Sequence, residues 1–225
     1  MTEFEKQFRE VQELLEFNDF NQTIKRVIDF TLDTENIDFY TKTNEFLNWL
    51  DHNEKEDEDK KTRLKTLLDE LHAFLSKKEC HNHQTIISVK NLQKVYNASF
   101  GLGPINLDIK TGEIIGLVGE NGNGKTTLLR SLCGELHPTS GTINYQFQYD
   151  DLYDLRTKLV YIPQRTDTWR GSMYENLEFT ASCYGYSPEE NNLVVDLVIT
   201  RLGLRKFRRH YWNNLSSGYK MRFEL

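Results

Sequence analysis

The sequence predicts an α/β domain preceded by an all-α segment of amphipathic helices. All 13 glycines and all 4 prolines lie after Phe100. Before residue 85, apolar side chains recur at helical spacing, whereas after it short β-prone stretches alternate with helical ones. We therefore divide the chain of 225 residues into an acidic helical segment, 1–84, and an α/β domain, 85–225.

Four apolar stripes predict four helices in residues 1–84. Side chains three or four residues apart lie on one face of a helix, and four such faces can bury one another. The stripes are Phe4, Phe8, Val11 and Leu15; Ile24, Val27, Ile28 and Leu32; Phe39, Thr43, Phe46, Leu47 and Leu50; and Leu64, Leu67, Leu68, Leu71, Phe74 and Leu75. Polar stretches at 18–21, 33–36 and 51–59 suit the turns, and Asp33, Thr34 or Asn36 suits a helix N-cap. We interpret the segment as a docking or regulatory bundle.

The second part alternates strands and helices. The strand predictions are 86–90, 105–109, 114–118, 142–147 and 159–162, and the helix predictions are 128–133, 173–183 and 193–202. This alternation is typical of an α/β domain.

Charge changes where the composition changes. Residues 1–84 contain 12 Lys and Arg against 20 Asp and Glu, a net −8, whereas residues 85–225 contain 16 against 14, a net +2. Neither part has the basic excess typical of nucleic-acid binding, so no nucleic-acid partner is expected. No apolar run approaches the ~18 residues that span a bilayer, and the first residues lack a signal-peptide core. Three separated cysteines favour a reducing compartment, and we expect a cytoplasmic protein.

The most specific motif is the sequence GENGNGKTT at residues 119–127, which fits the phosphate-binding pattern G-x-x-x-x-G-K-S/T. It lies between the predicted strand and a helix that begins at Lys125, as this motif requires. Gly122 and Gly124 allow main-chain N–H groups to approach phosphate oxygens closely, and the helix N-terminus favours an anion. We predict that a nucleoside triphosphate binds here.

Each polar residue of the loop has an expected role. We expect Lys125 to bridge the β and γ phosphates, Thr126 to bind Mg²⁺ and Thr127 to contact the α phosphate. The cofactor-binding set is completed by Asn121 and Asn123 within the same loop.

The stretch 112–129 resembles the opening of an ABC-type ATPase domain, and further motifs follow in the family's order. The resemblance covers 85–225. Its other parts are Tyr96 within Lys94-Val95-Tyr96, Gly134 with residues 138–143, the Q-loop-like Tyr161-Ile162-Pro163-Gln164, Tyr174-Glu175-Asn176-Leu177, and the signature-like Leu215-Ser216-Ser217-Gly218-Tyr219.

The resemblance implies further site residues. Tyr96 would stack on adenine, and Gln164 would contact Mg²⁺ or the attacking water, with Lys125 and Gln164 acting in catalysis. The signature segment would contact ATP bound to the opposite subunit of a head-to-tail dimer, through Ser216, Ser217, Gly218 and Tyr219. Two of these depart from the family pattern, because Ser217 replaces a glycine and Tyr219 replaces a glutamine. We expect weakened closure of that dimer.

The resemblance also implies a function in transport. We expect ATP binding and, in the complete protein, Mg²⁺-dependent ATP hydrolysis that energises an ABC membrane transporter, at the inner face of the membrane through a transmembrane partner that contacts residues 169–177. The sequence ends at Leu225, before the Walker B strand, so we expect an incomplete domain with weak ATP binding and negligible turnover. The alternatives are a soluble ABC-type ATPase acting on ribosomes or DNA, and a non-hydrolysing interaction protein with a helical docking domain.

Two groups of polar residues have a structural interpretation. A basic cluster before the signature suits a solvated helix end better than a partner or lipid contact; it consists of Arg201, Arg205, Lys206, Arg208 and Arg209. Cys80, His81 and His83, with His72, are weak zinc-ligand candidates because nearly all of them lie in one short linker.

Overall fold

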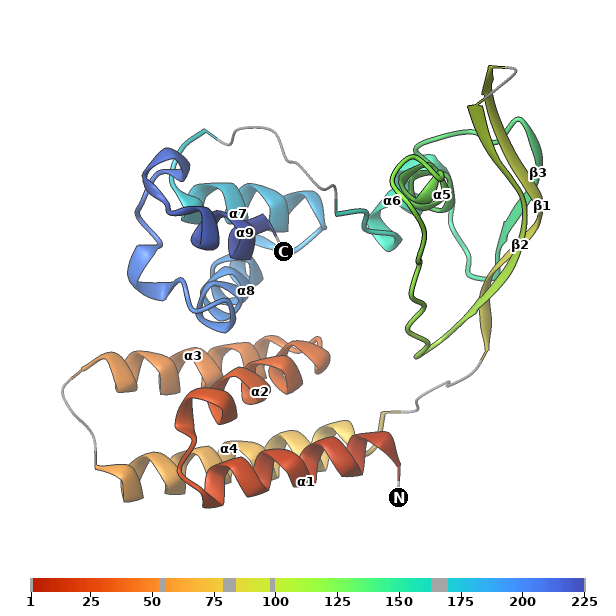
Figure 1. The fold of residues 1–225 in the computed structure, drawn as a ribbon. Helices are drawn as coiled ribbons and strands as arrows, with labels where there is room; N and C mark the ends of the chain where they lie inside the picture. The colour runs from red at the N-terminus through yellow and green to blue at the C-terminus, as the bar shows by residue number, and fades with distance from the viewer. Residues whose placement is uncertain (1, 53–55, 79–83, 98–99, 163–169, 225) are drawn as a thin grey trace. The chain divides into compact units, whose positions relative to one another are not determined.

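The computed structural model describes residues 2–52, 56–78, 84–97, 100–162 and 170–224. Contacts within the chain group these residues into two units, whose helices and strands are drawn in Figure 1. The helical unit combines Met1–Glu79 with Arg165–Leu225, and the sheet unit contains Cys80–Gln164. The composition boundary at residue 84 falls near the start of the sheet unit, whereas the last sixty residues group with the N-terminal helices.

The four N-terminal helices predicted from the apolar stripes are confirmed. They are α1 (Glu3–Glu16), α2 (Phe20–Asp33), α3 (Ile37–Asp51) and α4 (Asp57–Leu75). Side-chain caps fix three of the starts: Thr2 accepts a hydrogen bond from the N–H of Glu5, Asp19 accepts one from Gln22, and Asn36 accepts one from Asp38. Of the three N-cap candidates for α3, Asn36 is therefore the one used.

The rest of the helical unit follows residue 170. It comprises α7 (Met173–Cys183), α8 (Pro188–Arg201), the short 3-10 helices η1 (Arg205–Phe207) and η2 (Trp212–Asn214), and α9 (Ser217–Glu224). The helix predictions over 173–183 and 193–202 are confirmed, although α8 begins earlier because Ser187 caps it and Pro188 occupies its first position. No helix among the described residues is both long enough and apolar enough to cross a membrane.

Helix α8 belongs to two apolar cores. Val194 and Leu197 are buried in the core that the four N-terminal helices form. Val195 and Ile199 are buried in a second core, with residues of α7, η2 and α9. Figure 1 shows α2 and α3 lying between α8 on one side and the α1–α4 pair on the other. This double burial explains why the C-terminal helices group with the N-terminal bundle.

The described residues of the sheet unit form three antiparallel strands and two helices. Strand β1 (Thr85–Asn97) lies between β2 (Phe100–Lys110) and β3 (Ser140–Tyr145), and Val89 pairs with Leu107 on one side and Ile143 on the other. Helix α5 (Lys125–Leu132) buries Leu128 and Leu132 against the sheet. Helix α6 (Leu152–Lys158) follows β3 in the chain. The overall α/β prediction is confirmed.

Two strand predictions are wrong. Residues 114–118 and 159–162 form no strand, and Ile114 and Val118 are 99% and 98% exposed. A strand exists only where a neighbour supplies partners for its N–H and C=O groups, and the three described strands pair with one another instead. Apolar, β-branched composition alone therefore does not place these stretches in the sheet.

Candidate functional site

The phosphate-binding sequence leads directly into α5, which begins at Lys125. Gly122 and Gly124 have φ angles of 90° and 80°, in the left-handed region that favours glycine. Gly124 is the N-cap of α5, and no described side chain caps this helix. The first N–H groups of α5 are therefore not taken by a side-chain cap, which leaves the helix N-terminus suited to an anion.

Close packing adds a second requirement for glycine at one position of the loop. A Cβ atom at Gly124 would lie 2.8 Å from Cδ1 of Leu102, which packs on the core of the sheet unit. At Gly122 a Cβ atom would meet nothing within 4 Å, so only the backbone angle favours glycine there. The loop is thus held against β2 at Gly124 and open at Gly122.

The Lys125 side chain folds back over its own loop. Its Nζ donates to the carbonyl oxygens of Gly119 at 2.6 Å and Glu120 at 2.8 Å. These contacts hold a positive charge beside the open backbone of the loop. The other polar residues assigned to the nucleotide are exposed or half-buried; they are Asn121, Asn123, Thr126 and Thr127.

Tyr96 lies near the same helix start. It is close to the end of β1, and its hydroxyl is 3.4 Å from Oγ1 of Thr127. The ring is 48% exposed, and the Lys94 Nζ lies 5.8 Å from its centroid. The structure therefore brings Tyr96 together with the loop residues, 31 positions apart in sequence.

The signature-like segment belongs to the helical unit, where it begins α9. The Ser216 Oγ accepts a hydrogen bond of 3.4 Å from the N–H of Tyr219, so Ser216 caps the helix. Ser216, Ser217 and Gly218 are exposed. Tyr219 differs from them, because it is half-buried and its ring lies 4.5 Å from the ring of Phe207.

Several candidate residues lie outside the described residues. They are Gln164, expected at the Mg²⁺ and the water, Trp169 at the start of the expected partner contact, and the zinc candidates Cys80, His81 and His83. Among the residues that are described, no group of three or more His, Cys, Asp or Glu side chains could hold a metal ion.

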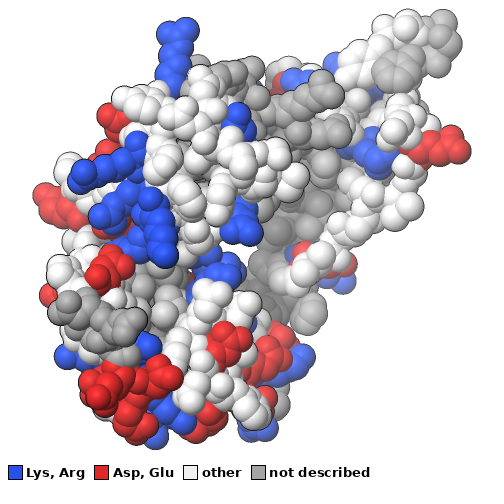
Figure 2. Space-filling view, turned by 60° about the vertical axis from the view of Figure 1, so that its left-hand side comes forward, with Lys and Arg blue, Asp and Glu red and all other residues white. Residues whose placement is uncertain are grey.

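The basic cluster before the signature is not simply a solvated helix end. The Arg201 Nε lies 2.6 Å from the Asp29 carboxylate, and the Arg205 guanidinium lies 2.8 Å from the Asp51 carboxylate. Both carboxylates belong to the acidic N-terminal helices. Figure 2 shows basic side chains gathered at the left of one face, above a group of acidic ones. The opposite net charges of 1–84 and 85–225 were the only sequence signal for these pairs.

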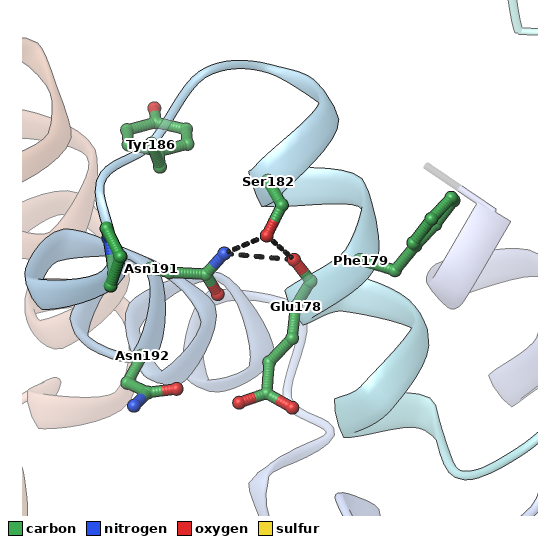
Figure 3. Close-up of a pocket in the computed structure, with 7 residues that line it drawn as sticks. Glu178, Phe179, Ser182, Tyr186, Asn191 and Asn192 are labelled. Carbon is green, nitrogen blue, oxygen red and sulfur yellow. Dashed lines mark hydrogen bonds between the residues drawn. The ribbon is translucent and has the colours of Figure 1, made fainter.

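A pocket of about 330 Å³ lies between α7 and α8, and no residue assigned to the nucleotide lines it. The Asn191 amide lines it and donates to the Glu178 carbonyl oxygen at 2.9 Å and to the Ser182 Oγ at 2.8 Å (Figure 3). These polar groups tie the two helices together. The lining consists of Glu178, Phe179, Ser182, Tyr186, Pro188, Asn191 and Asn192.

Similar proteins are ATP-binding proteins of transporters. The probable multidrug ABC transporter ATP-binding protein YbhF of Escherichia coli K12 is 30% identical over 159 residues, which are 69% of this chain and 27% of the relative. The methionine import ATP-binding protein MetN 1 of Acinetobacter baylyi is 35% identical over 148 residues, which are 60% of this chain and 41% of the relative. The chain thus spans less than half the length of these curated relatives.

Solved structures lead to the same family. An ATP-binding subunit of an ABC transporter superposes with a TM-score of 0.56 at 25% identity, covering 62% of this chain and 60% of that one. The cbiO1 protein of Clostridium perfringens, part of the ABC transporter complex cbiONQ, gives 0.54 at 28% identity, covering 62% and 59%. Residues 102–225 match the protein family described as ABC transporter. Since that match covers more than half of the chain, the protein belongs to the ABC transporter family, and its relatives there are ATP-binding subunits.

Proposed function

We propose that this chain binds ATP through residues 119–127 and that the whole protein hydrolyses ATP to energise a membrane transporter. The observation that carries the proposal is the bare backbone at Gly122 and Gly124, which leads into an uncapped helix start with the Lys125 ammonium beside it. Main-chain N–H groups, the helix dipole and a lysine together complement a polyphosphate. Relatives named as ATP-binding proteins of transporters support the same assignment.

The same residues fit a nucleotide-bound Mg²⁺. A Cβ atom at Gly122 would meet nothing within 4 Å, so the loop is open there to a phosphate chain. Thr126 is exposed in the first turn of α5, where its hydroxyl would be a ligand of the ion. When bound, Mg²⁺ neutralises phosphate charge. Tyr96, whose hydroxyl lies beside Thr127, would stack on the adenine ring.

The proposed partners are a transmembrane transporter subunit and a second nucleotide-binding domain. In a head-to-tail pair, each phosphate-binding loop would face the other copy's Ser216–Tyr219 segment. The exposed Ser216, Ser217 and Gly218 at the start of α9 are accessible for such a contact. The cytoplasmic face of a membrane is the location that these partners imply.

Isothermal titration calorimetry with Mg²⁺ and ATP tests the proposal. The Lys125→Ala variant is expected to bind about 10- to 100-fold more weakly than the unchanged chain, because a hydrogen bond to a charged group contributes about 1.5–3 kcal/mol. Lys90→Ala is the matched control, since Lys90 is an exposed lysine of β1 outside the loop. Binding by the control should equal that of the unchanged chain.

Two results would contradict ATP binding at this loop. One is the absence of binding heat for the unchanged chain when circular dichroism shows that it is folded. The other is equal affinity of the unchanged chain and Lys125→Ala, which would place the nucleotide elsewhere.

A further inference from the structure

The Arg205 side chain connects three parts of the helical unit. Its Nη2 donates to the Asn48 Oδ1 at 2.9 Å and lies 2.8 Å from the Asp51 Oδ2, both in the last turn of α3. Its Nη1 donates to the Thr200 Oγ1 of α8 at 3.0 Å. The side chain is only 14% exposed. A planar guanidinium with several fixed donors is suited to hold an amide, a carboxylate and a hydroxyl at once.

The short helix that begins with Arg205 also contacts the signature-like segment. Phe207, at its end, places its ring 4.5 Å from the ring of Tyr219. Leu204, just before it, is fully buried in the core that also contains Leu215 and Phe223. The turn at 204–207 thus touches residues before and within α9.

Helix α9 has little means of holding its own position. It contains 8 residues, and an isolated helix of this length is marginal in water, so tertiary contacts decide its orientation. Its first residues are exposed, and Ser216 provides only one long capping hydrogen bond of 3.4 Å. Tyr219 packs on Phe207, Phe223 packs on Trp212, and the Lys220 Nζ lies 5.5 Å from the centroid of the Trp212 ring.

We propose that Arg205 is a positioning residue, through which the N-terminal helices set the orientation of the segment Ser216–Tyr219. Arg205 fixes η1 to the end of α3, and η1 fixes Tyr219 through Phe207. The N-terminal bundle is then a support of the signature-like segment and moves with it. For the consequence on ATP-driven dimerisation, this inference rests on the proposed function; the positioning itself does not.

Amide hydrogen exchange of the full chain without nucleotide tests the positioning. In Arg205→Ala, amides of residues 216–224 are expected to exchange about tenfold faster, because the charged contacts that fix η1 are lost. Amides of α1 and α4 should keep their rates, which separates positioning from general loss of stability. Lys206→Ala is the matched control, since Lys206 is exposed on the same short helix, and it should behave as the unchanged chain.

Two further variants locate the connection. The double variant Asn48→Ala/Asp51→Ala should also speed exchange at 216–224, because it removes both partners of Arg205 on α3. If Arg205→Ala fails to fold, Arg205→Lys takes its place, because it keeps the positive charge. It is expected to speed exchange in the same segment, because one ammonium cannot bind Asn48, Asp51 and Thr200 together.

The proposal is overturned if folded Arg205→Ala or Arg205→Lys leaves exchange at 216–224 unchanged. It is equally overturned if the arginine variants speed that exchange but the double variant Asn48→Ala/Asp51→Ala does not, since Arg205 would then act without the N-terminal helices. Neither result depends on nucleotide. Failure of the positioning is therefore distinguishable from failure of ATP binding.

Discussion

The helical unit and the sheet unit differ in how fully they bury their apolar residues. In the helical unit, two cores enclose residues from every helix, and α8 contributes to both. In the sheet unit, one core joins the three strands to α5, while Ile114 and Val118 are almost completely exposed. Helices satisfy their backbone groups internally, whereas a strand depends on a neighbour. A helical sequence pattern therefore forms a helix from its own residues, whereas a strand pattern forms a strand only when a distant segment pairs with it.

The largest expected effect compares a buried leucine with an exposed isoleucine. Leu71→Ala should lower the free energy of unfolding of the helical unit by ~2–5 kcal/mol, because Leu71 is fully buried. Ile114→Ala removes a similar side chain but should change the stability of the sheet unit by less than ~0.5 kcal/mol. Urea unfolding followed by tryptophan fluorescence reports the helical unit, whose described residues include Trp49 and Trp212. Amide exchange in β1 reports the sheet unit.

A large loss for Ile114→Ala would contradict this comparison. It would mean that the stretch 114–118 is covered in solution and that the two units bury their apolar residues equally.

A smaller effect compares one glycine from each unit. Gly124→Ala should destabilise the sheet unit by ~1–2 kcal/mol, because its φ is 80° and its Cβ atom would press on Leu102. Gly218→Ala should stabilise α9 by up to ~1 kcal/mol, since the site is open and alanine favours a helix. Amide exchange in α5 and in α9 measures the two changes separately. Effects of the same sign would refute the distinction between a strained loop and an ordinary helical turn.

The smallest effect concerns a carboxylate of α8. Burial raises the pKa of Asp196, while Arg205 and Arg208 oppose the shift. The folded state therefore holds this proton more tightly than the unfolded state, and ionisation costs stability as the pH rises from the ordinary aspartate pKa through the raised value. Asp196→Asn should be slightly more stable than the unchanged chain at neutral pH, and this advantage should vanish below about pH 4.

Urea unfolding at the two pH values measures the difference. If Asp196→Asn is instead less stable at neutral pH, the arginines outweigh burial at this site. The polar side of α8 would then contribute to the stability of the helical unit as its apolar sides do.

Short-range patterns predicted much of the fold and of the candidate site. The four N-terminal helices follow from spacings of three and four residues, since each helix is built from contacts within one or two turns. The glycines of the phosphate-binding loop and the helix at Lys125 are adjacent in sequence, and in the structure Gly124 is the N-cap of that helix. The family resemblance assigned Tyr96 to the nucleotide that the loop would bind, but its contact with Thr127, 31 residues away, is a finding of the structure.

The sequence by itself determined the four N-terminal helices and the phosphate-binding loop with the helix that follows it, because consecutive residues provide nearly all the groups that these features need. Only the tertiary structure decided that α8 would bury Val194 and Leu197 among the N-terminal helices, that Arg205 would bind Asn48 and Asp51, and that residues 114–118 would form no strand. These contacts join residues more than a hundred positions apart, and a strand needs a neighbouring strand with which to pair. Whether they form depends on the entropy of closing the chain between distant residues, which the local spacing of residue types does not predict.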